Sequence, residues 1–188
     1  MIFFNYRTLL SLALVVLLAA CSSTPTATMD FNPEVDFSGV RTIAIQPINR
    51  TVASQAILSD MQIGRVDASL TAELQRRGFQ VVQDNADADM LLAWHLVTQE
   101  RTDVRSFNNN TRYNCWNCRG MGMGSGTNVT VRQYTQGTFI VDMIDPNSLQ
   151  AVWRSVFESR MRDHSDAARA TEARDTAVAA ALAGFPPK

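Results

Sequence analysis

The chain has few of the residues that build most catalytic and metal-binding sites. It contains only two histidines and three cysteines in 188 residues. A structural zinc site needs four ligands, and His95 and His164 are isolated, with no second pair of ligands spaced to complete a site. The sequence also has no G-x-S-x-G nucleophile motif and no P-loop. We therefore expect neither an enzyme nor a bound cofactor.

A strong charge of one sign and a long apolar run are absent as well. The chain has 17 basic and 18 acidic residues, a balance that gives no electrostatic basis for binding nucleic acid. The apolar run over residues 9–18 is about half of the roughly 20 residues that a membrane-spanning helix needs. This run therefore fits the apolar part of a cleaved signal peptide better than a permanent membrane span.

Cys21 ends this segment in the way that is typical of bacterial lipoproteins. Arg7 supplies the positive charge that precedes the apolar run, and Leu18-Ala19-Ala20-Cys21 matches a lipobox. The thiol is needed because the lipid is attached through a thioether, and the small residues let the signal peptidase reach the backbone. The alternative is an ordinary secretory signal with a chance cysteine. We expect lipidation at Cys21.

The lipid predicts where the mature chain is held. Each buried methylene of an acyl chain contributes about 0.8 kcal/mol, so two or three chains anchor a protein stably in a membrane. Ser22 stands where an aspartate would favour retention at the inner membrane. We expect an outer-membrane lipoprotein whose domain faces the periplasm.

The remaining sequence predicts one domain. Residues 1–20 form the signal peptide, residues 21–29 comprise the lipidated cysteine and a small polar tether, and residues 30–188 form a single α+β domain. Strands are expected at 40–46, 79–82, 88–99, 129–144 and 149–161, with helix as an alternative for 88–99. A loop rich in Asn and Gly is expected at 106–127.

Two helices are expected, at about 60–77 and 165–183. Four apolar residues of the first fall on one helical face at spacings of three and four: Ile63, Val66, Leu70 and Leu74. Ser59 or Asp60 can cap its start, and Gly78 follows its end. The element order predicts an antiparallel or mixed sheet with two amphipathic helices packed on one face, a two-layer sandwich.

Cys115 and Cys118 form the sharpest local motif of the domain. A local disulfide, a thioredoxin-like redox pair and a zinc site are the alternatives. The nearby Met121 and Met123 suggest two further alternatives, a Cu(I) site or an apolar loop tip that touches a partner or lipid. We favour the disulfide, because a redox CxxC normally begins a helix after a strand and this one lies in a loop.

The clustered aspartates are expected to cap turns. Asp142 and Asp145 flank the end of a strand, and three more occur in one acidic turn, at Asp84, Asp87 and Asp89. Carboxylates in such places accept hydrogen bonds from turn backbone. We expect no acid–base role for them.

Several segments together resemble a known family. They are 36–44 (DFSGVRTIA), 77–82 (RGFQVV) followed by 86–91 (ADADML), 137–145 (GTFIVDMID), 151–154 (AVWR) and the closing Phe185-Pro186. In this order they resemble bacterial lipoproteins of the domain-of-unknown-function family 4136, over residues 30–187. The resemblance implies a lipid-anchored protein of the cell envelope with no established active site.

Three functions follow from these expectations. The first is a non-enzymatic accessory or scaffold protein for envelope machinery, with a protein partner. The second is a binding module for a small envelope ligand (a lipid, a glycan or a metal), placed on the uncovered sheet face or in the loop 106–127. The third is a thiol–disulfide or copper-handling protein that uses Cys115 and Cys118.

Overall fold

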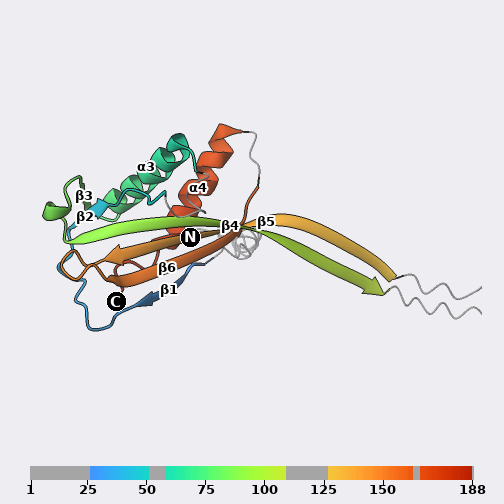
Figure 1. Ribbon diagram of the computed structural model, residues 1–188, viewed down its shortest axis with the longest axis horizontal. Coiled ribbons are helices and arrows are strands. Elements are labelled where there is room, and N and C mark those ends of the chain that lie inside the picture. The colour runs from blue at the N-terminus through green and yellow to red at the C-terminus, as the bar shows by residue number, and fades with distance from the viewer. Residues whose placement is uncertain (1–25, 51–57, 109–126, 163–165, 188) are drawn as a thin grey trace, which may run out of the picture.

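The computed structural model of the chain describes residues 26–50, 58–108, 127–162 and 166–187. A six-stranded sheet and two helices form the domain (Figure 1). The strands are β1 (Thr28–Phe31), β2 (Thr42–Ile45), β3 (Gln80–Val82), β4 (Met90–Asn108), β5 (Thr127–Ile144) and β6 (Ala151–Arg160). The helices are α3 (Asp60–Arg76) and α4 (Ala167–Ala181), and a short 3-10 turn, η1 (Asn85–Asp87), precedes β4.

The sheet is mixed, in the order β1-β6-β5-β4-β2-β3. β4, β5 and β6 form an antiparallel meander, and β1 pairs antiparallel with β6. β2 lies parallel to both β3 and β4. Both helices lie on the same side of this sheet (Figure 1). The prediction of an α+β domain with a mixed sheet and two helices is therefore confirmed.

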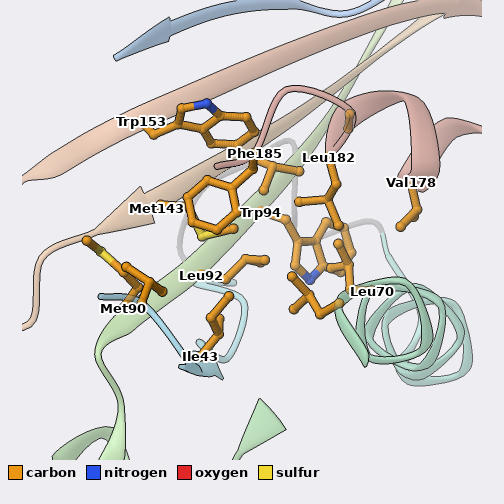
Figure 2. Packing of buried hydrophobic residues seen from close by; sticks show 14 of the residues in the cluster. Ile43, Leu70, Met90, Leu92, Trp94, Met143, Trp153, Val178, Leu182 and Phe185 are labelled. Atoms are coloured by element: carbon orange, nitrogen blue, oxygen red, sulfur yellow. The ribbon is translucent and has the colours of Figure 1, made fainter. Parts of the chain in front are cut away.

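The core lies between the helices and the sheet. Successive strand residues point to opposite faces, and Leu92, Trp94, Val141 and Met143 all point to the helix side, where they are buried. Leu70 of α3, and Leu182 and Phe185 at the end of α4, pack onto them (Figure 2). The apolar faces predicted for both helices are the faces that form this core.

The boundaries of α3 follow from its sequence. The Ser59 hydroxyl accepts the N–H of Gln62, and the Gln62 side chain accepts the N–H of Ser59, which makes a capping box. Gly78 follows the helix with φ 92°, a conformation that glycine adopts without strain. Ser59 is thus the N-cap of the two predicted candidates.

The part-buried guanidinium of Arg77 joins the ends of the two helices. Its Nε donates to Glu73 Oε1 of α3 at 2.7 Å, and the guanidinium also donates to the carbonyl oxygens of Leu182 (2.5 Å) and Ala179 (3.2 Å). The carbonyls of the last helical turn have no partner within their own helix, and that of Leu182, the C-cap residue, otherwise accepts only the N–H of Phe185 among the described residues. Arg77 therefore caps α4 from the neighbouring helix.

Most predicted boundaries agree with the structure to within about two residues, and the differences that matter lie at β1 and at the far ends of β4 and β5. Thr28 and Met29, which were assigned to the tether, lie in β1, because they pair with Val156 and Ser155 of β6. The strand predicted at 88–99 continues to Asn108, and β5 begins at Thr127 rather than at residue 129. The predicted loop 106–127 is therefore strand at both of its ends, and its middle lies outside the described residues.

Candidate functional site

β4 and β5 continue together well past the rest of the sheet (Figure 1). β2 pairs with β4 only as far as Leu92, and β6 pairs with β5 only as far as Gln136. The pairing of β4 with β5 goes on to Asn108 and Thr127. We call residues 99–108 and 127–136 the ribbon.

One face of the ribbon carries three exposed valines. Val104 lies directly opposite Val131, and Val129 follows two residues away on the same side of β5. Their side chains are 59%, 58% and 57% exposed. Neighbouring β-branched residues support strand structure, but so much exposed apolar surface on a two-stranded element is unusual unless something else covers it.

The other face of the ribbon is charged. Asp103 lies opposite Arg132, and Arg101 and Arg105 occupy the same face of β4. Arg105 Nε lies 3.4 Å from Asp103 Oδ2. The alternation of strand residues therefore separates three arginines from three valines across the thickness of one ribbon.

Arg160, at the end of β6, holds the base of the ribbon. Its guanidinium carbon lies 4.0 Å from the centroid of the Tyr134 ring, a cation–π distance. Its Nη2 also lies 3.4 Å from Asp103 Oδ2. These contacts tie the charged face of the ribbon to the end of β6.

Both outer edges of the ribbon present backbone groups. Gln46 donates to the Leu92 carbonyl and Met161 donates to the Thr135 carbonyl. By alternation, the peptide groups of Thr102 and Val104 on β4, and of Val129 and Val131 on β5, point away from the partner strand. No strand of the described residues pairs with these edges. Such edges are templates for adding a strand from another chain.

The cysteine sites predicted from the sequence lie outside the described residues. This applies to Cys21, Cys115 and Cys118, to the two loop methionines Met121 and Met123, and to His164. Lipidation, the disulfide and the copper site therefore stay predictions.

His95 lies on the sheet face that the helices do not cover. It is half-buried opposite Ile140 of β5. On the same face Asp142 is buried, and the Arg154 guanidinium donates to both of its carboxylate oxygens at 2.6 and 2.9 Å. The ion pair raises the pKa of Arg154 through its hydrogen bond to Asp142. Asp142 thus has a cross-strand ionic partner.

Two other aspartates accept backbone hydrogen bonds, Asp145 in a turn and Asp89 at the start of β2. The Asn147 backbone N–H and the Ser148 hydroxyl lower the pKa of Asp145. The backbone N–H groups of Thr42 and Arg41 lower the pKa of Asp89, each with its nitrogen 2.8 Å from Asp89 Oδ2.

Asp84 also accepts a backbone N–H, that of Ala86, and so caps η1. The turn-capping prediction is therefore confirmed for Asp84 and Asp145, whereas Asp89 instead accepts backbone N–H groups at the start of β2. No such hydrogen bond involves Asp87 in the part of the chain that the structure describes.

The described ranges lack two further kinds of feature. They contain no group of three or more His, Cys, Asp or Glu side chains that could hold a metal ion. No helix within them is long and apolar enough to cross a membrane.

The ribbon was not recognised from the sequence. A signal was present, because Val129 and Val131 alternate with Thr130 and Arg132, a period-two pattern typical of a strand with two different faces. The Asn and Gly residues that follow position 107 favoured a loop instead.

The architecture defines a class, a mixed-sheet α+β domain with a projecting hairpin, and comparison with known proteins gives the family. Residues 27–187 match the family described as a domain of unknown function, DUF4136. The chain belongs to this family, as the resemblance predicted. None of the curated proteins is significantly similar to the chain.

One solved structure shares the fold at low sequence identity, and two others are similar with lower scores. A PDZ domain protein from Parabacteroides distasonis is 13% identical with a TM-score of 0.52; the match covers 87% of this chain and 36% of that protein. A DUF4136 family protein from Bacteroides thetaiotaomicron is 14% identical, with 88% and 97% covered and a TM-score of 0.48. PelC from Paraburkholderia phytofirmans, solved as a dodecamer, is 11% identical, with 87% and 99% covered and a TM-score of 0.49.

Proposed function

We propose that this chain is a non-enzymatic accessory protein of the bacterial cell envelope, held at the outer membrane by lipid on Cys21, and that its ribbon docks on a protein partner in the periplasm. The observation that carries the proposal is the exposed Val104, Val129 and Val131 face on a ribbon whose two edges pair with no strand of the described residues.

The energetics of the ribbon support a partner. A two-stranded hairpin without further packing is marginally stable in water. Proteins usually protect a long edge strand by covering it, shortening it or placing charge on it. Here the arginines and Asp103 lie on one face, and Glu100, near the domain, is the one charged residue among the described positions of the valine face. Among the described residues, the three valines and both edges stay available to another chain.

The geometry suits addition of a strand from that partner. In such complexes the backbone of an edge strand supplies hydrogen bonds, and alternate side chains give specificity. A strand added beside β5 would place its apolar side chains next to Val129 and Val131. The arginines on the opposite face would then select against partners that present positive charge there.

Replacing part of the ribbon tests the proposal directly. Arg101 and Tyr134 are register partners, so an Asn-Gly turn can replace residues 102–133 without changing the pairing nearer the domain. The matched control joins another pair, Phe107 and Asn128, by the same turn and removes only residues 108–127. Full-length chains with each change would be crosslinked mildly in cells and captured from solubilised membranes.

The proposal expects a defined partner with the wild type and the control, and its loss with the ribbon-shortened chain. If the ribbon-shortened chain still retrieves the partner, or if the control loses it too, the described ribbon is not the docking element. If none of the three chains retrieves a partner, the accessory function itself is contradicted.

A further inference from the structure

A second feature, separate from the ribbon, lies between the helices and the sheet. A cavity of about 390 Å³ opens there, bordered by α3, α4, β4, β5 and β6. This volume is within the range of about 300–1,000 Å³ that is usual for small-molecule sites.

The inner wall of the cavity is apolar and preformed. Trp94, Phe139, Phe157 and Val178 line it and are almost fully buried. The one polar atom of the Trp94 ring is already used, because its Nε1 donates to Asp67 Oδ1 at 2.8 Å. The ring therefore offers the cavity an apolar surface.

Every charged residue that borders the cavity is an arginine. They are Arg65 of α3, Arg160 at the end of β6, Arg162 two residues past it, and Arg174 of α4. The whole chain has slightly more acidic than basic residues. The charged residues that border the cavity are all basic, which differs from this balance.

The arginines differ in how far they are already engaged. Arg160 contacts Tyr134 and Asp103, and Arg174 donates to Ser69 Oγ at 3.0 Å. Arg65 and Arg162 are exposed, and no carboxylate forms an ion pair with either of them among the residues that the structure describes. Two guanidinium groups thus stay available beside an apolar cavity.

We infer that this cavity binds an anionic amphiphile, with its acyl chain against Trp94, Phe139 and Phe157 and its headgroup at Arg65 and Arg162. A guanidinium group binds carboxylate or phosphate through paired N–H groups, and the apolar wall provides the hydrophobic contribution. The shared chemistry is an alkyl chain with a carboxylate or phosphate headgroup.

Photolabelling of the full-length protein in phosphatidylethanolamine vesicles tests the inference. Three dodecyl probes with a diazirine near the chain end would be compared: dodecyl phosphate, dodecanoate and uncharged dodecanol. The labelled residues would be identified by peptide mass spectrometry. The two anionic probes distinguish a phosphate ligand from a carboxylate ligand.

The expected result is labelling of cavity residues, at least tenfold stronger for one anionic probe than for dodecanol. Arg65→Gln with Arg162→Gln should abolish that preference. Ala177→Leu, on the half-buried face of α4 that lines the cavity, should reduce all cavity labelling at least fivefold. If Ala177→Leu lowers the melting temperature, Ala173→Leu replaces it as the variant that fills the cavity. Ala173 borders the same cavity but is exposed.

Equal labelling by dodecanol and the anionic probes would overturn the inference, as would labelling confined to the N-terminal segment or unaffected by the leucine substitutions. The ribbon-shortened chain should still be labelled, because it keeps Leu96, Gly137 and Met161 at the cavity. Failure of the ribbon proposal and failure of this inference are therefore distinguishable.

Discussion

Val104 and Val131 face each other directly across β4 and β5, and each keeps nearly three fifths of its surface exposed. In a sheet covered by helices such a pair would be buried. Here it lies beyond the last residue of β6, where no helix of the described residues reaches. This pair therefore marks the ribbon as a surface with apolar side chains that a partner could cover.

Val104→Thr combined with Val131→Thr should weaken partner capture at least tenfold. Threonine keeps the β-branched shape and the strand preference but replaces a methyl group by a hydroxyl, which lowers the hydrophobic contribution to docking. Quantitative capture from solubilised membranes would measure the loss. Val97→Thr is the control, because Val97 is partly exposed on the opposite face of β4; an equal loss there would contradict the role of the valine face.

Arg77→Met should lower the free energy of unfolding by about 2–3 kcal/mol, because the Ala179 carbonyl loses its donor, the Leu182 carbonyl keeps only the Phe185 N–H, and Glu73 loses a part-buried ionic partner. Arg76→Met is the matched control: Arg76 also contacts Glu73, but its side chain is 67% exposed, and such a pair contributes below about 1 kcal/mol. Urea unfolding would measure both. Equal losses would show that Arg77 does not cap α4.

Glu73 predicts a pH dependence of stability. Its hydrogen bond with Arg76, followed by those with Arg77, lowers the pKa of Glu73 below its usual value of 4.5 against the effect of burial. A carboxyl whose pKa is lowered by folding contributes fully above its unfolded pKa and loses this contribution as the pH falls through the folded pKa. The difference in unfolding free energy between wild type and Glu73→Gln should therefore shrink below about pH 4.5. A difference that stays constant down to pH 3 would contradict this role of Glu73.

Asp89→Ala should cost about 1 kcal/mol, because two backbone N–H groups at the start of β2 lose their acceptor and water can replace it only in part. Asp87→Ala, on the exposed 3-10 turn two residues earlier, should change stability much less. Thermal unfolding of both variants would decide. A larger loss for Asp87→Ala would show that Asp89 does not hold β2 to the start of β4.

Cys21→Ser should abolish acylation and signal-peptide processing, because serine cannot form the thioether. Metabolic labelling with a fatty-acid analogue and membrane fractionation would measure both effects. A serine variant that is still acylated, or that still fractionates with the outer membrane, would show that Cys21 is not the anchor.

The helices could be predicted because their signals are local. Leu70 and Leu74 recur at helical spacing, Ser59 and Gly78 mark the ends, and the structure keeps all four roles. β1 could not be predicted in the same way. Thr28 and Met29 become strand only through pairing with Val156 and Ser155, more than 120 residues further along the chain.

The two candidate sites also differ in whether their sequence signals are local. The valine face of the ribbon follows from alternation within one segment, although the Asn and Gly residues beside it concealed the length of the strand. The cavity combines Arg65 of α3, Trp94 of β4 and Arg162, which lies two residues past β6. No local pattern brings such residues together, so only the fold could place them.

Photo-crosslinking in intact cells tests the central claim most directly. A photo-crosslinking phenylalanine analogue would replace Val131 on the ribbon or, as the control, Ala72 on the exposed side of α3. The account predicts one discrete adduct from position 131 that is absent from position 72, with the attached protein identified by mass spectrometry. No adduct at position 131, or the same adducts from both positions, would contradict docking through the ribbon.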